Sequence, residues 1–185
     1  MIDDNLHWIL SFYRSSEISG ALFFGELART LRPSAIQQDM TRHFADEANH
    51  ARYWTDCLSA LGAEPLKIGH AYQDQYLAAA GAPANLMEIL AITHVFEKRV
   101  VVQYALHAKT LNLPAVVRET LKTIMDDERW HIQWTRDALT GMERDYGADN
   151  IKATLERLIA ADRDVYQRTV LEHSERIGEM RLANR

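Results

Sequence analysis

The sequence predicts an all-α protein in which four long helices form a bundle with one long crossover, followed by an additional C-terminal helix. Apolar residues recur at spacings of three and four along five long segments, and no segment alternates in the manner of a strand. Short turns join the first segment to the second and the third to the fourth, whereas residues 62–84 separate the two pairs. Two hairpins joined by one long connection give a bundle with a crossover.

The first two helices are bounded by clear stop and start signals. The first is expected over about residues 4–31, because Pro33 disfavours helical backbone at the residue before it. Ser34 can cap a second helix over about residues 35–61, and Gly62 is suited to end it.

The rest of the chain follows the same pattern. Residues 62–84 are interrupted by glycine and proline, with room for one short helix over about residues 70–80. Three further long helices are expected over about residues 85–111, 114–139 and 151–180. A polar stretch at 141–150 precedes the last of them.

Size and composition narrow the class of protein. The 185 residues are expected to form a single domain, 1–185, with the bundle at about 4–140 and the extra helix at about 150–180. The formal net charge is −5 and no basic patch stands out, so nucleic acid is not expected as a partner. Cys57 is the only cysteine, which excludes an internal disulfide and a Cys-x-x-Cys metal site. The sequence has neither a signal-peptide pattern nor an apolar run of membrane-spanning length, so a cytoplasmic setting is expected.

Both halves of the predicted bundle carry the same pattern of carboxylate and imidazole side chains. A lone glutamate in one helix is followed by Glu-x-x-His in the next, and positions three residues apart share a helix face. The candidate metal ligands are Glu17, Glu47, His50, Glu97, Glu128 and His131.

The distances of these glutamates from the turns support this set. Residues at equal distances from the turn of an antiparallel hairpin lie at the same height. The midpoint of positions 17 and 47 falls beside Pro33, and that of positions 97 and 128 falls beside Pro114. Each glutamate thus lies about 15 residues, or roughly 23 Å along its helix, from its turn. Glu26 and Glu88 each lie about 13 Å from that level and are set aside.

Charge balance predicts that the cluster binds metal. Four carboxylates on otherwise apolar helix faces would cost many kcal/mol to bury without cations. Those faces carry no lysine or arginine, and two divalent cations would balance the charge. Glutamate and histidine ligands suit Fe, Mn and, less selectively, Zn. The alternative to a metal site is a structural or partner-binding bundle without an active metal. In that case the histidines would be hydrogen-bonded residues of the core.

Over about residues 5–140 the chain resembles the ferritin-like di-iron carboxylate superfamily, whose signature is two glutamates and two Glu-x-x-His motifs on four helices. The resemblance implies two Fe ions, with Mn or a mixed Mn/Fe pair as alternatives. It implies that Glu47 and Glu128 bridge the metals, that Glu17 and Glu97 are more terminal ligands, and that each histidine binds one metal.

The resemblance also implies a role for the aspartate that precedes each Glu-x-x-His motif. In several oxygen-activating members, this aspartate forms a hydrogen bond with a ligating histidine from the other half. That arrangement would pair Asp46 with His131 and Asp127 with His50.

Within the superfamily the chain looks rubrerythrin-like, with two departures. Val100 stands where rubrerythrins commonly carry an extra glutamate, and a single cysteine excludes a rubredoxin-type module. The resemblance then implies a non-haem di-iron oxidoreductase that uses O2 or peroxide to oxidise a small organic substrate, with an external electron donor. A ferroxidase or a rubrerythrin-like peroxidase is the alternative, and a monomer and a homodimer both remain open.

Other residues are candidates for secondary roles. Tyr13, one turn before Glu17, can hydrogen-bond a carboxylate, relay an electron or simply pack. His43 and His94 are each an extra ligand or, as we favour, a hydrogen-bonded core or surface histidine. We expect Val100, Val101 and Tyr104 to form an apolar lining just past the level of the metal ligands. Such a lining suits an organic substrate, but an ordinary hydrophobic core would look the same. Packing or interface roles are expected for Trp54, Trp130 and Trp134.

Overall fold

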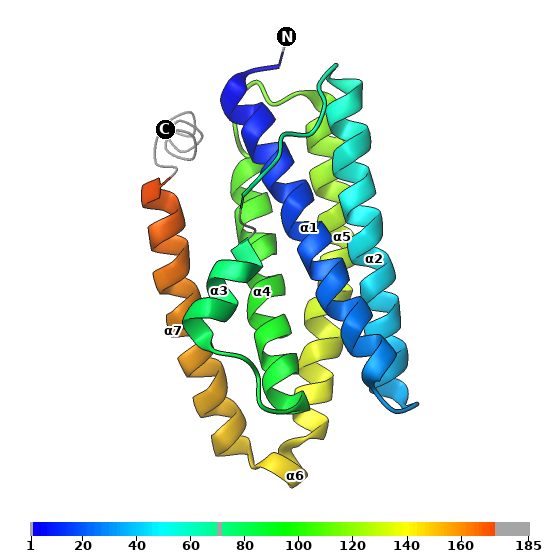
Figure 1. The fold of residues 1–185 in the computed structure, drawn as a ribbon, viewed down its shortest axis with the longest axis vertical. Helices are drawn as coiled ribbons and strands as arrows, with labels where there is room; N and C mark the ends of the chain where they lie inside the picture. The colour runs from blue at the N-terminus through cyan, green and yellow to red at the C-terminus, as the bar shows by residue number, and fades with distance from the viewer. Residues whose placement is uncertain (1, 70–71, 173–185) are drawn as a thin grey trace.

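The computed structural model describes residues 2–69 and 72–172, and within them it contains seven helices and no strand (Figure 1). The prediction of an all-α protein is confirmed for this part of the chain. No helix in it combines the length and the apolar character needed to cross a bilayer. The helices are α1 (Asp4–Thr30), α2 (Ala35–Ala60), α3 (Tyr72–Ala80), α4 (Leu86–His107), α5 (Ala115–Gly141), α6 (Glu143–Tyr146) and α7 (Ala148–Glu172).

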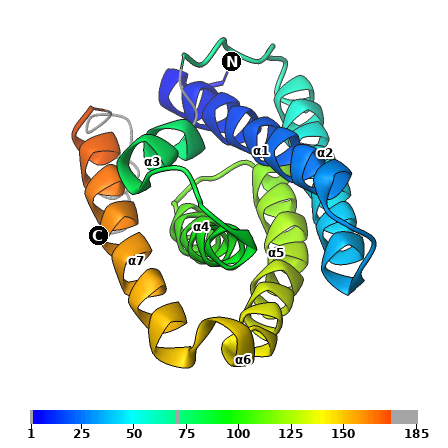
Figure 2. The same ribbon diagram turned by 60° about the horizontal axis from the view of Figure 1, so that its bottom comes forward.

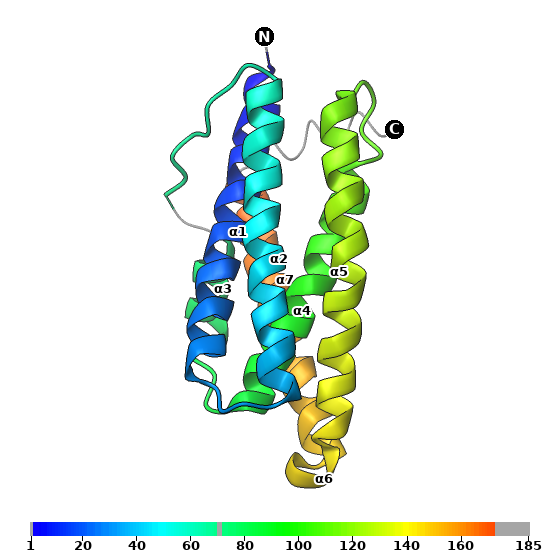
Figure 3. The ribbon, with the colours of Figure 1, turned by 90° about the vertical axis from the view of Figure 1, so that its right-hand side faces the viewer.

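The four longest of the first five helices form two antiparallel hairpins. α1 pairs with α2, α4 pairs with α5, and α2 packs along α5, so that the hairpins lie side by side (Figure 3). The segment between α2 and α4 carries α3 and returns along the length of the molecule to the start of α4 (Figure 1). α7 packs against α3 and α4, and α4 lies inside an arc of α3, α7, α6 and α5 (Figure 2).

Side-chain caps fix where three of the long helices begin. The Ser34 hydroxyl accepts a hydrogen bond from the Gln37 amide at the start of α2, and Asn85 accepts one from the Glu88 amide at the start of α4. Asp3 does the same at α1. Each cap satisfies a backbone N–H group that has no partner within the helix and contributes about 1 kcal/mol.

The helix expected over 85–111 was predicted too long, because it ends at His107. Residues 108–110 close into tight turns, and Asn112 adopts a left-handed backbone conformation with φ of 59°. Asparagine tolerates this conformation better than most residues. The turn buries Leu113 in the core before α5 begins.

The polar stretch at 141–150 is also more ordered than expected. α5 continues to Gly141, α6 follows at once, and α7 begins at Ala148 rather than at residue 151. Gly147, with φ of 81°, separates the last two helices in a conformation that glycine adopts without steric cost. The predicted continuation of the last helix to residue 180, and residues 70–71 of the expected short helix, lie outside the described residues.

A buried carboxylate attaches α7 to its neighbours. Asp162 is 3% exposed, accepts hydrogen bonds from the Tyr72 hydroxyl at 2.8 Å and from Arg99 Nε at 2.9 Å, and so links α7 to α3 and α4. The Tyr76 hydroxyl donates to the Leu158 carbonyl oxygen in the same interface. Because its charge is paired and hydrogen-bonded, Asp162 can lie among apolar side chains.

Candidate metal centre

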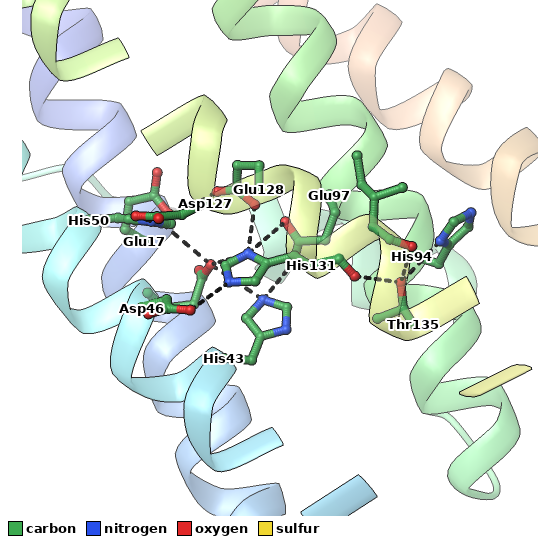
Figure 4. Close-up of polar contacts among 12 residues, drawn as sticks. Glu17, His43, Asp46, His50, His94, Glu97, Asp127, Glu128, His131 and Thr135 are labelled. Atoms are coloured by element: carbon green, nitrogen blue, oxygen red, sulfur yellow. Dashed lines mark hydrogen bonds and ion pairs between the residues drawn. The ribbon is translucent and has the colours of Figure 1, made fainter. Parts of the chain in front are cut away.

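The structure brings the six predicted ligands together between the two hairpins. Figure 4 labels five of them, all except Glu47. Each predicted ligand is at most 4% exposed. Glu128 lies at the centre: its two carboxylate oxygens lie 3.3 Å from His50 Nδ1 and 2.7 Å from His131 Nδ1. Helix periodicity and equal distances from the turns thus predicted the convergence of these side chains.

The side chains form two overlapping groups, each with oxygen and nitrogen donors suited to a metal ion. Within each group, one atom from every residue lies within 4.8 Å of the others, and Glu47 belongs to both groups. The first group is Glu17, Glu47, His50 and Glu128; the second is His43, Glu47, Glu97 and His131.

The four carboxylates have no lysine or arginine beside them within the described part of the chain. Their ion-pair partners there are histidines. Burial, together with repulsion from neighbouring carboxylates, raises the pKa values of Glu47 and Glu128 well above the usual range. Burial acts in the same direction on Glu97, but the adjacent His43 outweighs it and lowers the pKa of Glu97 to about 2. Fully ionised, the cluster requires additional cations.

The aspartates before the two motifs orient the two histidines. Asp46 Oδ2 lies 3.3 Å from His131 Nε2, and Asp127 Oδ2 lies 3.4 Å from His50 Nε2, which are the pairs that the family resemblance implied. A carboxylate accepts, so each Nε2 carries the proton and each Nδ1 presents its lone pair to the glutamates. This orientation of an imidazole by a carboxylate is typical of metal-ligating histidines.

The resulting contacts fit a bound cation. His50 Nδ1 and Glu128 Oε1 are buried and have no hydrogen-bond partner among the described residues. A lone pair facing a carboxylate is unfavourable unless a proton or a metal ion lies between them. Burial lowers the pKa of His50, but Asp127 and Glu17 more than compensate and raise it well above its usual value. Protons therefore occupy the metal-free cluster, and a metal ion would displace them.

His43 is the main addition to the predicted set. Its Nε2 atom lies 2.9 Å from Glu97 Oε1, and its ring stacks on that of His131. The Trp134 indole N–H donates to His43 Nδ1 at 3.2 Å. An indole N–H can only donate, so Nδ1 must accept and the ring proton is assigned to Nε2. The protonated Nε2 then faces the Glu97 carboxylate. His43 is hydrogen-bonded through Nδ1 and also belongs to one of the two groups that could hold a metal ion, so both roles considered for it stay predictions.

Trp134→Phe is expected to remove the constraint that keeps the His43 ring proton on Nε2. Without the indole donor, the His43 proton can reside on either ring nitrogen. The ¹⁵N chemical shifts of the two nitrogens in the metal-free protein should then move towards each other. Trp130→Phe is the matched control, because Trp130 meets the His43 ring edge-on and its indole makes no hydrogen bond to His43. Unchanged His43 shifts in Trp134→Phe would contradict the assignment.

His94 lies outside both ligand groups. Its Nδ1 atom lies 3.0 Å from the Thr135 hydroxyl, and the ring points away from the glutamates (Figure 4). Burial lowers the pKa of this half-buried histidine. The structure therefore places His94 as a hydrogen-bonded histidine at the edge of the core.

Tyr104 makes the hydrogen bond that we considered for Tyr13. The Tyr104 hydroxyl donates to Glu17 Oε1, and Trp54 Nε1 lies 3.4 Å from the same oxygen. Tyr13 instead packs its ring edge-on against Tyr104, with ring centroids 4.7 Å apart. Burial and the nearby Glu17 carboxylate raise the pKa of Tyr104 well above its usual value, so its hydroxyl keeps its proton and remains a donor. A relay role for Tyr13 stays a prediction.

Gly20 gives the Glu47 carboxylate room to enter the cluster. A Cβ atom built on Gly20 would lie 2.2 Å from Glu47 Oε2. A larger side chain at this position would therefore require the Glu47 carboxylate to move. Gly20 lies three residues, or about one helical turn, after Glu17 on the same helix.

A largely apolar cavity of about 140 Å³ adjoins the carboxylates. It lies between α1 and α4, takes part of its wall from α3, and is bordered by Glu17, Glu47 and Glu97. The apolar lining expected beside the third long helix is present at Val100 and Tyr104, whereas Val101 is not among the lining residues.

Comparison with protein-family models, characterised proteins and solved structures finds no match for this chain. The ferritin-like resemblance therefore rests on the ligand pattern and its geometry. What the structure shows directly is an all-helical protein with a buried Glu/His cluster that can hold metal.

Metal-free protein is expected to lose stability as the pH rises from about 4.5 towards 7.5. Folding raises the pKa values of Glu47, Glu128 and His50, so the folded state binds more protons than the unfolded state across this range. Their stabilising contribution is lost as the pH passes through the folded-state pKa values. Glu97, whose pKa is lowered, acts in the opposite direction only at more acidic pH.

Metal binding should reverse this trend, because bound metal replaces the protons. The rise in Tm caused by Mn²⁺ should be larger at about pH 7.5 than at about pH 5.5. Thermal denaturation with and without Mn²⁺ at both values measures the difference. In Glu128→Gln the pH slope of the metal-free protein should flatten, while Glu26→Gln should leave it unchanged. A metal-free protein that is most stable at neutral pH would contradict this expectation.

Proposed function

We propose that the chain is a ferritin-like four-helix bundle that holds two iron ions between its hairpins and oxidises a small organic substrate. The observation that carries the proposal is the pair of aspartate-oriented histidines, whose Nδ1 lone pairs face four buried carboxylates. Two divalent ions would satisfy those lone pairs and neutralise the carboxylates together. The four-helix arrangement and the metal number and identity belong to the proposal.

Each histidine would bind one metal ion. His50 and Glu17 would hold the first ion, and His131 and Glu97 the second. Glu47 belongs to both groups and Glu128 faces both histidines, so these two would be shared. When bound, such an iron pair supplies the redox steps with O2 or peroxide that the side chains themselves cannot perform. Electrons would come from an external donor, as the single cysteine excludes a Cys-x-x-Cys iron centre in this chain.

The protein's own side chains would set the direction of access. Glu17, Glu47 and Glu97 border the cavity, whereas His50 and His131 do not line it. A molecule in the cavity would therefore approach the metals from the α1–α4 side, past carboxylates that can change their binding mode. The Tyr104 hydroxyl, hydrogen-bonded to Glu17, would hold that carboxylate in position. The apolar wall would keep bulk water away from the reacting groups.

The cavity favours oxidation of an organic substrate over the handling of iron or peroxide alone. A ferroxidase or a peroxidase needs access only for an ion or a small polar molecule. Here the space next to the carboxylates is walled by phenylalanine, valine and leucine side chains. Such a lining is typical of sites that bind small organic molecules.

Metal analysis followed by rapid mixing tests the proposal. Protein purified from iron-rich medium should contain about two irons per chain. After reduction, its absorption change on mixing with O2 should be faster or larger when a small apolar compound is present. Less than about half an equivalent of tightly bound metal would favour a structural module. Rapid peroxide turnover that no organic compound affects would favour a peroxidase, and either result would overturn the proposal.

A further inference from the structure

We infer that the cavity between α1 and α4 binds a neutral, apolar molecule about the size of a single aromatic ring, and that this is the substrate class of the proposed oxidation. That the bound molecule is a substrate rests on the proposed function, whereas the binding site itself is inferred from the cavity alone. Three features of the cavity carry it: its wall, its charges and its volume.

The wall is built from large apolar side chains on three helices. α1 and α4 supply most of the wall, and α3 contributes Leu77 and the ring of Tyr72. Aromatic side chains favour edge-on or offset contact with another ring. The apolar wall consists chiefly of Phe12, Phe23, Phe24, Phe96, Val100 and Leu77.

The charges around the cavity exclude an ionic ligand. Among the described residues, Arg99 is the only basic one that lines it, and Asp162 binds the Arg99 guanidinium at 2.9 Å. An anionic ligand would have to compete with that carboxylate, which is itself buried. At the other end, two divalent ions would neutralise the glutamates, leaving no net negative charge to attract a cation. Ser19 and Gln103 add only neutral polar groups.

The volume limits the ligand to a small molecule. The cavity measures about 140 Å³. An engineered apolar cavity of about 150 Å³ in another protein stays dry and binds benzene. A single six-membered ring with a small substituent therefore fits, whereas a fused-ring compound does not.

The position of the cavity places the ligand beside the reacting groups. Val100 lies one helical turn after Glu97 on α4, and both line the same cavity. Gly20 lies one turn after Glu17 on α1 and also lines it. A ring packed between Val100 and Gly20 would therefore lie next to Glu17, Glu47 and Glu97, on the side of the cluster that His50 and His131 do not line.

Binding of fluorinated probes to the full-length protein, followed by ¹⁹F NMR, tests this inference without any redox step. Fluorobenzene should bind saturably at one site in metal-free and in Mn²⁺-loaded protein. 4-Fluorobenzoate should bind at least about tenfold more weakly, since Arg99 is already paired. Equal or tighter binding of the benzoate would overturn the charge argument, and no saturable binding of fluorobenzene would overturn the site.

Two variants locate the bound probe. Val100→Trp should fill the cavity and reduce fluorobenzene affinity at least about tenfold. Val102→Trp, at a position that is 52% exposed on the same helix, is the matched control and should leave the affinity unchanged. If Val100→Trp does not fold, Phe23→Ala decides the matter, because shortening this half-buried wall residue should allow 1-fluoronaphthalene to bind.

The outcomes separate the binding site from the proposed function. Fluorobenzene that binds in wild type and Val102→Trp but not in Val100→Trp supports the site, whether or not the protein consumes O2. Binding that Val100→Trp leaves unchanged would place the probe elsewhere and overturn the inference. If the site is confirmed but the protein holds no metal, the proposed function fails while the binding site remains.

Discussion

Glu128→Ala is expected to abolish binding of both metal ions. Glu128 is fully buried, and of the four glutamates it lies closest to the two histidine Nδ1 atoms, with its oxygens 3.3 Å from His50 Nδ1 and 2.7 Å from His131 Nδ1. Removing it takes from each of the two histidines the carboxylate oxygen that lies nearest to its Nδ1 atom. Loss of a hydrogen-bond partner behind a ligand already costs about 10–100-fold in metal affinity, so the loss of a carboxylate that faces both histidines should exceed that. Metal content after gel filtration measures the effect.

Glu26→Ala is the control for this prediction. Glu26 lies on the same helix as Glu17, but its side chain is 61% exposed and pairs with Arg29 at the surface. Its removal should leave two metal ions in place, and Glu47→Ala should behave like Glu128→Ala. Equal metal loss in Glu26→Ala and Glu128→Ala would mean that the buried cluster is not the metal site.

Gly20→Ala should separate helix stability from metal binding. Alanine in a helix interior is normally about 0.5–1 kcal/mol more stable than glycine. The new Cβ would lie 2.2 Å from Glu47 Oε2, so that the flexible Glu47 side chain has to move away. Misplacing a reacting group by about 1 Å can cost about a hundredfold. The metal-free variant should therefore melt at or above the wild-type temperature, while its metal affinity falls by more than about tenfold.

Gly25→Ala, on the same helix, is the matched variant. The nearest atoms to a Cβ there belong to the half-exposed Phe44 ring, at 3.1 Å, and this ring can shift towards solvent. Its metal affinity should stay at the wild-type value. Isothermal titration with Mn²⁺ and thermal denaturation of both variants measure the two effects. Wild-type metal affinity in Gly20→Ala would show that Glu47 does not need its present position.

The predicted ligands and their convergence followed from quantities that a sequence contains. Helix periodicity places Glu47 and His50 on one face, and equal distance from the turn places Glu17 at their level. Burial of four carboxylates without lysine or arginine then points to cations. These arguments need only the rise of a helix and the position of a turn, so they do not depend on the conformations of the side chains.

The surrounding hydrogen bonds could not be predicted in the same way, because they depend on how helices from different hairpins approach each other. Tyr104 lies seven residues after Glu97 on the same helix face, and the sequence marked it as a lining residue, but not as a partner of Glu17 on another helix. The contact between Trp134 and His43 likewise joins α5 to α2. Glycine at position 20 was recognisable as small, but the contact that requires it is tertiary.

Asp162 illustrates a signal that was present and missed. It lies four residues after Leu158 and three before Val165, on the buried face of the last helix, where an unpaired carboxylate is costly. A charged residue in that position predicts a buried partner. The helix also begins earlier than expected, because the turn at Gly147 depends on a left-handed backbone conformation that periodicity does not reveal.

The attachment of α3 to α7 would let α7 influence how long a molecule stays in the cavity rather than the reaction itself. Tyr72 lines the cavity with its ring and anchors to Asp162 with its hydroxyl, so the same residue belongs to the cavity wall and to the fastening that holds it. A molecule that left past α3 would have to separate Tyr72 from Asp162, so the strength of this contact would bear on how long the molecule stays inside. Asp162→Asn would weaken the fastening without touching a single ligand. α7, which supplies none of the candidate ligands, would thus influence how long a molecule remains in the cavity.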